Sequence, residues 1–330
     1  MKRLHVRHIL LFVIAALLAG CAGWYAHIWY SLHTNAHASR RVALKGYEFT
    51  SPLLDVELPK GVNIDSEPIP FKYIIEAYIK KAVDSGQARN VAVYYRDLHD
   101  GPWFGIHEDM EFNPASMMKV PVMIAWLKRA EKTPLVLRQK MTFRASDRPV
   151  PQPYTKPAQE IESGKSYTVD ELLRYMMNYS DNKATSLLYK TLNDKELADV
   201  LDSMDVNNNP RDEDNFISVH GFSGFFRILY NAAYLNREMS ERALQLLSLQ
   251  DFPLGIAAGV PKGTKVAAKF GEIVPEHGGG DVQVHEFGIV YHPHRPFILG
   301  IMTRGADFTK QAGIIREISR IVYIEVDSSI

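Results

Sequence analysis

Apolar residues recur at helical spacing in several separate stretches of the chain. The first stretch runs from Pro68 to Ser85 and stops at Gly86, a residue type that commonly ends helices. The same periodicity predicts helices in later stretches, namely Val169–Met177, the residues through Ala184, Leu187 and Leu188, Ser218–Leu235, Ser240–Leu249 and Phe308–Tyr323. Between Glu131 and Lys165, proline and charge predict mostly loop, with partial structure at Thr133–Phe143.

Alternating apolar and polar residues predict strands near both ends of the globular part. Asn90–Tyr95 and Trp103–Ile106 flank an Asp-Gly turn, which is typical of a β-hairpin. The last third alternates again in Lys265–Phe270, His285–Tyr291 and Phe297–Thr303. Because these strands enclose the helices in sequence, we predict an α+β fold with a five-stranded antiparallel sheet flanked by helices and an inserted all-helical subdomain. We expect residues 67–330 to form this domain.

The N-terminus has the pattern of a membrane-targeting segment. Basic residues come first, an apolar run follows from Ile9 to about Tyr30, and tryptophans and tyrosines gather at its far end. Residues 1–30 are therefore either an uncleaved signal anchor or a lipoprotein signal, since Leu18–Cys21 resembles a lipobox. We favour the anchor because the apolar run continues past Cys21. Both alternatives tether the protein to a membrane and place it outside the cytoplasm.

Residues 31–66 form a polar stalk in this interpretation, with one apolar segment, Tyr47–Leu54, that we expect to dock onto the domain. Lysine plus arginine and aspartate plus glutamate are 38 each, so the charge balance does not favour a nucleic-acid partner. Cys21 is the only cysteine, which excludes an internal disulfide. The histidines show no zinc-ligand spacing, and we expect no metal, no cofactor and a monomeric protein.

A serine and a lysine stand three residues apart in an apolar stretch between Asn113 and Ala125. On a helix this spacing places Ser116 and Lys119 on one face, within hydrogen-bonding reach. Burial among apolar neighbours would keep the lysine partly deprotonated, so that it could take the serine proton during attack on a carbonyl. Pro114 lies where a first-turn proline would open that helix.

Three short motifs follow one another along the chain, and together they resemble those of a known family. They are Ser116-Met117-Met118-Lys119, Ser180-Asp181-Asn182 and Lys269-Phe270-Gly271. Their order and separation resemble the penicillin-recognising serine enzymes, most closely the class A β-lactamases, over about Pro68 to Ile324. Flanking segments such as Phe112–Ala115 and Gly259–Gly263 extend the resemblance.

The resemblance implies a role for each motif residue. Ser116 would be the nucleophile that forms an acyl-enzyme, and Lys119 would be its base or the donor that orients it. Ser180 would pass a proton to the departing nitrogen, and Asn182 would bind the substrate's side-chain amide and the lysine.

The third motif would bind the rest of the substrate. The resemblance implies that Lys269 holds the substrate carboxylate and lowers the pKa of Lys119. The oxyanion hole would come from the backbone N–H of Ser116 and of a strand residue past Gly271, which we assign to Ile273. Without the family match, Lys269 would be a solvated strand lysine and Ser180-Asp181-Asn182 a helix N-cap.

Two departures from the family pattern affect the expected activity. Phe270 replaces the family's threonine or serine, whose hydroxyl binds the substrate carboxylate, and we expect its ring to narrow the cleft. The segment Asn207–Asn215 lacks the Glu-x-x-Leu-Asn of the class A loop, whose glutamate activates the deacylating water. We expect Asp212, Glu213 and Asp214 in that segment to cap a helix or face solvent.

These observations lead to three functional hypotheses. The first is a membrane-tethered serine hydrolase of the class A β-lactamase type that acylates Ser116 with β-lactams and turns over slowly. The second keeps the nucleophile but acts on the D-alanyl-D-alanine end of cell-wall peptide, as a carboxypeptidase or transpeptidase. The third is a non-catalytic surface binding module with the same fold.

Overall fold

The computed structural model describes residues 47–51, 69, 71–99, 101–144, 146–147, 154–204, 206, 216–275 and 280–329. All of them belong to one compact unit, Tyr47–Ile330. The predicted membrane segment 1–30 and most of the predicted stalk 31–66 lie outside the described residues. Within the described ranges, no helix has both the length and the apolarity that a bilayer crossing requires.

The predicted five-stranded antiparallel sheet is confirmed. Its order is β2-β1-β9-β8-β7, so that β2 and β7 are the edge strands. The hairpin predicted from the Asp-Gly turn forms β1 and β2, and the alternating last third forms the other three strands. Their bounds are β1 Asn90–Asp97, β2 Trp103–Ile106, β7 Val266–Ile273, β8 Val282–Val290 and β9 Phe297–Gly305.

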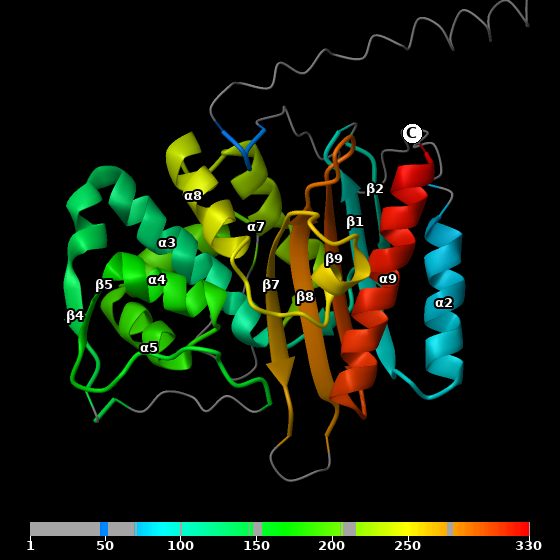
Figure 1. The fold of residues 1–330 in the computed structure, drawn as a ribbon, viewed down its shortest axis with the longest axis horizontal. Coiled ribbons are helices and arrows are strands. Elements are labelled where there is room, and N and C mark those ends of the chain that lie inside the picture. Colours follow the sequence, from blue (N-terminus) through cyan, green and yellow to red (C-terminus); the bar gives the residue numbers. More distant parts are fainter. Residues whose placement is uncertain are drawn as a thin grey trace, which may run out of the picture. The chain divides into compact units, whose positions relative to one another are not determined.

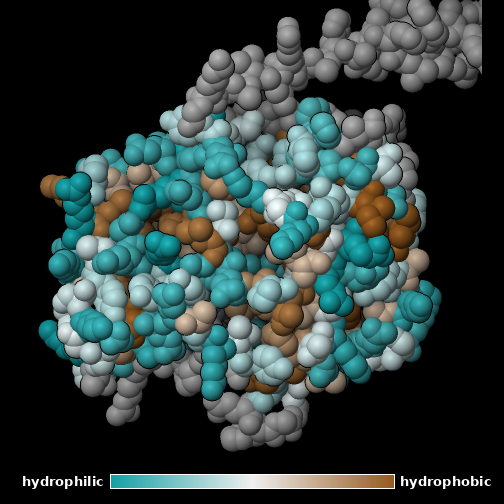
Figure 2. All heavy atoms as spheres, in the orientation of Figure 1, coloured by the Kyte–Doolittle hydropathy of each residue, from teal (hydrophilic) through white to brown (hydrophobic). Residues whose placement is uncertain are grey.

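Helices cover both faces of the sheet and divide the core into two parts. α2 (Lys72–Asp84) and α9 (Phe308–Ser328) pack on one face, where their apolar residues form a buried cluster with side chains of β1, β8 and β9 (Figure 1). α7 (Val219–Asn231) packs on the other face and joins it to the predicted helical subdomain. That subdomain contains α3 Lys119–Lys132, α4 Val169–Asn178, α5 Asn182–Thr191, α6 Asp194–Asp202 and α8 Arg237–Leu247. In the face seen in Figure 2, hydrophilic residues cover most of the surface and hydrophobic ones show in separate patches.

The structure contains elements that the periodicity did not predict. Helix α6 begins with a capping box in which Asn193 and Glu196 satisfy each other's backbone N–H groups, and it buries Leu197, Val200 and Leu201. The capping residues and the apolar positions are present in the sequence, but the periodicity did not predict α6 because the helix is short and follows α5 closely. The predicted partial structure after Thr133 consists of a 3-10 turn, Pro134–Arg138, and of β4 (Lys140–Thr142), which pairs with β5 (Ser166–Thr168). β3 (Glu111–Phe112) and β6 (Ile217–Ser218) form another two-stranded ribbon.

The segment Tyr47–Ser51 is docked onto the domain, as expected for the apolar part of the stalk. One carboxylate, that of Glu241 on α8, accepts hydrogen bonds from three successive backbone N–H groups, at 2.5 Å from Glu48, 2.9 Å from Phe49 and 2.9 Å from Thr50. The Tyr291 hydroxyl donates to the Phe49 carbonyl at 3.1 Å. The docked segment therefore depends on a single side chain for three hydrogen bonds.

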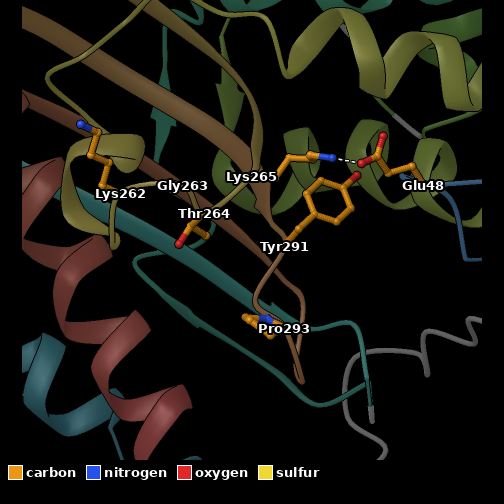
Figure 3. A pocket seen from close by; sticks show the side chains of 7 residues that line it. All are labelled: Glu48, Lys262, Gly263, Thr264, Lys265, Tyr291 and Pro293. Atoms are coloured by element: carbon orange, nitrogen blue, oxygen red, sulfur yellow. Dashed lines mark hydrogen bonds and ion pairs between the residues drawn. The ribbon is translucent and has the colours of Figure 1, made fainter.

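A cavity of about 450 Å³ lies beside this docked segment, at the start of β7. Figure 3 shows Lys265 directed at Glu48, with which it forms an ion pair, and Tyr291 below them. Lys262, Gly263, Thr264 and Pro293 complete the lining. Lys265 precedes Lys269 by four residues of extended chain, about 13 Å, so this cavity is separate from the motif residues.

We expect Glu241→Ala to release the segment Tyr47–Ser51 without unfolding the domain. Hydrogen bonds to charged groups contribute about 1.5–3 kcal/mol each, and the substitution removes the common acceptor of three. Hydrogen exchange should therefore accelerate at the amides of Glu48, Phe49 and Thr50. Glu238→Ala on the same helix is the matched control, because Glu238 is exposed. Unchanged protection of the three amides in Glu241→Ala would contradict the docking role.

Candidate active site

Ser116 lies on a short 3-10 turn rather than in an α-helix. The turn spans Ala115–Met118, with Pro114 at its N-cap position, and α3 begins at Lys119. The predicted first-turn proline thus opens the 3-10 turn. In a 3-10 turn residues three apart eclipse each other, which brings the Lys119 Nζ to 3.0 Å from the Ser116 Oγ. Ser116 is partly exposed, whereas Lys119 is buried.

The backbone before Ser116 is held in an unusual conformation. Ala115 has a φ of 49°, which is rare for a residue with a side chain, and its N–H donates to the Asn113 Oδ1 at 3.0 Å. The Asn113 carbonyl accepts from the His285 Nε2 at 3.1 Å, while the His285 Nδ1 accepts from the Thr303 N–H at 3.2 Å. Burial lowers the pKa of His285 to about 3, so the ring is neutral and its proton is on Nε2. His285 therefore joins β8 and β9 to the nucleophile turn.

Lys119 is the centre of the site's hydrogen-bond network. Its Nζ contacts the Ser180 carbonyl at 2.6 Å, the Ser180 Oγ at 2.9 Å and the Asn182 Oδ1 at 2.7 Å, in addition to Ser116. Burial, followed by the positive charge of Lys269, lowers the pKa of Lys119 well below the usual lysine value. A neutral amine at this position can accept the proton of the serine hydroxyl.

The second motif forms the break between α4 and α5. Ser180 is fully buried with a φ of 56°, which turns its hydroxyl and its carbonyl toward Lys119. Asp181 is the N-cap of α5, and its carboxylate accepts from the N–H groups of Lys183 at 2.7 Å and Ile161 at 2.8 Å. The helix-cap interpretation is therefore correct for Asp181, but Ser180 and Asn182 also contact the lysine.

Lys269 is buried inside the protein rather than solvated. It lies on the edge strand β7, is 0% exposed, and donates to the Ser180 Oγ and to the Phe270 carbonyl, both at 3.1 Å. Burial lowers its pKa to about 7, against the opposing effect of Glu286 and Glu272. The two lysines thus meet at one hydroxyl, that of Ser180.

Gly271 allows β7 to lie against the nucleophile turn. A Cβ at this position would lie 2.5 Å from the Pro114 carbonyl oxygen and 3.1 Å from the Met117 nitrogen. The glycine in the third motif is therefore required for the close approach of the strand to Ser116.

The ring of Phe270 lies in the core, and the expectation that it narrows the cleft is wrong. The side chain is 1% exposed, stacks on Phe252 with ring centroids 4.3 Å apart, and belongs to the cluster on the α9 face. Its backbone N–H donates to the Gln250 Oε1 at 2.6 Å.

The assignment of Ile273 to the oxyanion hole does not fit the geometry of β7. The Phe270 N–H points to the free edge of the sheet, because it bonds the side chain of Gln250 and not β8. Alternate N–H groups of an antiparallel strand point the same way, so the N–H of Glu272 also faces the free edge and that of Ile273 faces β8. Glu272, the residue directly past Gly271, is therefore the strand residue placed to donate toward Ser116.

Glu272 also anchors the loop that leads to Ile161. Its carboxylate accepts from the Thr155 N–H at 2.7 Å and from the Thr155 hydroxyl at 2.6 Å. The same loop ends at Ile161, whose N–H bonds Asp181. Sequence reasoning missed Glu272, His285 and Glu286, although charged or polar residues in strands that are buried along their length are a recognisable signal.

The described residues show no cluster of side chains that could hold a metal ion. The acidic segment Asn207–Asn215, including Asp212, Glu213 and Asp214, lies outside the described residues.

The sequence and the fold were each compared with known proteins, and both comparisons find β-lactamases. Residues 74–326 match the model of the β-lactamase enzyme family. The curated β-lactamase VEB-1 of Pseudomonas aeruginosa is 29% identical over 87 residues, which are 26% of this chain and 29% of that protein. The chain's match thus spans less than a third of the length of that relative.

Two solved structures illustrate the likeness of fold. A class A β-lactamase from Mycobacterium abscessus is 22% identical, with a TM-score of 0.65 over 77% of this chain and 99% of that one. A mutant of PBP-A, in an acyl-enzyme complex with penicillin G, is 21% identical, with a TM-score of 0.64 over 78% of this chain and 97% of that one. At these identities the likeness concerns the fold.

Proposed function

Because this chain belongs to the β-lactamase enzyme family and is a serine hydrolase by that membership, we propose that it forms an acyl-enzyme at Ser116 with β-lactams. The observation that carries this proposal is the contact of 3.0 Å between the Ser116 Oγ and the amine of Lys119, whose pKa is lowered by burial and by Lys269. That arrangement pairs a nucleophile with a base.

The reaction that we propose begins with the transfer of the Ser116 proton to Lys119 as the Ser116 Oγ attacks the lactam carbonyl. The N–H groups of Ser116 and Glu272 would stabilise the resulting oxyanion. Collapse of the tetrahedral intermediate breaks the amide C–N bond, and the departing nitrogen receives a proton from the Ser180 hydroxyl. Lys119 lies 2.9 Å from that hydroxyl and can replace the proton.

The remaining motif residues would bind the substrate. Lys269 would attract the substrate carboxylate, and its charge also lowers the pKa of Lys119. Asn182 holds Lys119 through its Oδ1, and its amide group would also bind an acylamino side chain of the substrate.

Exposure to benzylpenicillin, followed by intact-mass measurement and peptide mapping, tests this function. We expect an increase equal to the whole penicillin mass, located on the peptide that contains Ser116. A protein that stays unmodified and consumes no lactam would contradict the proposal and would favour the non-catalytic binding module.

We expect the acyl-enzyme to persist once free penicillin has been removed. Hydrolysis of the ester needs an activated water, and the segment Asn207–Asn215 lacks the glutamate motif that supplies it in class A enzymes. Each tenfold loss in deacylation rate needs only about 1.4 kcal/mol of additional barrier. A chase in buffer free of penicillin, followed by mass spectrometry over time, measures the loss of the adduct. Rapid return of the free mass together with lactam consumption would show efficient turnover instead.

The same missing motif favours a second candidate activity, that of a D-alanyl-D-alanine carboxypeptidase or transpeptidase on cell-wall peptide. Such an enzyme uses the same nucleophile but transfers the acyl group of its peptide substrate to water or to an amine. Incubation with a pentapeptide that ends in D-alanyl-D-alanine should then release D-alanine. If no D-alanine is released while penicillin still acylates Ser116, the peptidase activity is excluded and the proposed reaction with β-lactams stands.

We propose further that residues 1–30 tether the domain 67–330 to a membrane through the stalk 31–66 and expose it outside the cytoplasm. The basic start and the apolar run up to Tyr30 support this placement. Membrane fractionation of the full chain and of a chain that starts at residue 31 tests it. Recovery of the full chain in the soluble fraction would contradict the tether.

A further inference from the structure

Lys269 is buried, and the part of the chain that the structure describes gives it no direct ionic partner. Among the described residues, its ammonium donates hydrogen bonds only to the Ser180 hydroxyl and the Phe270 carbonyl, and it forms no ion pair within 4.0 Å. Both acceptors are neutral, and an ammonium that leaves water without a counter-charge loses its proton easily. A lysine that is to attract a carboxylate therefore needs another source of negative potential.

The ring of Phe270 supplies part of that potential. The Lys269 Nζ lies over the ring, 4.3 Å from its centroid, and Phe252 stacks against the same ring at an interplanar angle of 12°. The negative face of an aromatic ring attracts a cation, and the effect grows when water is excluded. The residue that departs from the family motif thus contacts the charged group of the motif lysine.

Glu286 carries a buried carboxylate on β8, the strand next to Phe270. It stands directly opposite Phe270 in the ladder of β7 and β8, is 0% exposed, and acts on the charge of Lys269 more strongly than Glu272 does. Its oxygens accept from the Gln250 Nε2 at 2.8 Å and from the Ile256 N–H at 2.7 Å. Gln250 in turn accepts the Phe270 N–H, so the network returns to the strand that carries Lys269.

The space around Glu286 shows that the carboxylate is fixed in place. A Cβ on Gly255 would lie 1.8 Å from the Glu286 Oε2, so only a glycine lets the loop before Ile256 approach the carboxylate this closely. Two donors and a closely packed backbone hold the Glu286 carboxylate in one position on the strand next to Phe270.

We propose that the Phe270 ring and the Glu286 carboxylate together keep Lys269 protonated, which makes Glu286 a positioning residue for recognition of the substrate carboxylate. The inference rests on the proposed function, because it specifies how the site selects acyl donors that carry a carboxylate. Glu286 does not touch substrate in this arrangement and acts through Lys269.

The expected pH dependence follows from the charged groups around Lys269. Glu286 on β8 and Glu272 on its own strand raise the pKa of Lys269, while burial lowers it, and Lys119 on α3 is the neighbouring cationic group. Burial also raises the pKa of Glu286 to about 7, so its negative charge is fully present only on the alkaline side, where Lys269 would otherwise lose its proton. Removal of the Glu286 charge therefore lowers the pKa of Lys269. The protonated form then disappears at a lower pH, and affinity for a carboxylate disappears with it.

The test compares acylation of Ser116 by benzylpenicillin and by its methyl ester, which lacks the carboxylate. The ratio of the two second-order acylation rate constants, measured by mass spectrometry across pH, isolates carboxylate recognition from the protonation of Lys119. In Glu286→Gln we expect the ratio of the rate constant for benzylpenicillin to that for its methyl ester to decline at lower pH than in the wild type. At alkaline pH the ratio should be about tenfold smaller in the variant than in the wild type. Glu286→Asp keeps the charge and should restore most of the wild-type profile, and Phe270→Leu should shift it in the same direction as Glu286→Gln.

The outcomes separate this inference from the proposed function. If wild type and a folded Glu286→Gln variant are both labelled and their ratio of acylation rate constants depends on pH in the same way, the inference is wrong and the proposed function stands. The same conclusion follows if Glu286→Asp behaves like Glu286→Gln. A wild type that neither compound labels on Ser116 would overturn the proposed function and this inference with it. Thermal unfolding of each variant confirms that the compared proteins are folded.

Discussion

Replacement of Lys119 by alanine should lower the rate of Ser116 acylation by benzylpenicillin by about a thousandfold, since a general base contributes roughly 10²–10⁴ in rate. The Lys119 amine is the only described side-chain group in hydrogen-bonding contact with the Ser116 Oγ. Without it, the hydroxyl must lose its proton to water as it attacks. The measurement is the rate at which the penicillin adduct appears on the protein.

Lys119→Arg distinguishes a base from a fixed positive charge at this position. A guanidinium keeps the charge but is not deprotonated in proteins, so the variant should be as slow as Lys119→Ala. Lys183→Ala is the control, because Lys183 is nearby on α5 but bonds Glu160 outside the site. Near wild-type acylation in Lys119→Arg would show that the lysine acts through its charge alone, and the proposed proton transfer would then be wrong.

Much of the fold could be predicted from the sequence because its main elements carry strong local patterns. The Asp-Gly turn between two β-prone runs indicated the β1–β2 hairpin, and the apolar periodicity of Phe308–Tyr323 indicated α9. Helix α6 was not predicted, since its pattern covers little more than two turns. The 3-10 conformation at Ser116 could not be predicted either, because contacts from β7 and His285 hold it in place.

The motifs identified the residues that meet in the site but not the residues that set their charges. Ser116, Lys119, Ser180, Asn182 and Lys269 lie within one hydrogen-bond network, as their order along the chain indicated. The direction of each strand N–H depends on the β7–β8 register, which the local pattern of residues does not determine. For that reason Ile273 was assigned where Glu272 fits. Glu286 stands opposite Phe270 across the β7–β8 pair, a relation that spacing along the chain cannot reveal.

Gly271→Ala should reduce acylation of Ser116 by about a hundredfold in a protein that still folds, because misplacement of reacting groups by about 1 Å costs about that much. The added Cβ would lie 2.5 Å from the Pro114 carbonyl oxygen, so either β7 or the nucleophile turn must move. Movement of β7 displaces the N–H of Glu272 and the ammonium of Lys269 together. Movement of the turn displaces Ser116 itself.

Gly313→Ala provides the matched control for this substitution. Gly313 lies within α9, and a Cβ there meets nothing within 4 Å, so the change should stabilise the helix by up to about 1 kcal/mol and leave acylation unchanged. Acylation rates, adduct masses and thermal unfolding of both variants give the comparison. If Gly271→Ala acylates as fast as Gly313→Ala, the close contact between β7 and the nucleophile turn does not set the geometry of the reaction. A specific loss in Gly271→Ala would instead show that the third motif works through the position of its strand as well as through the charge of its lysine.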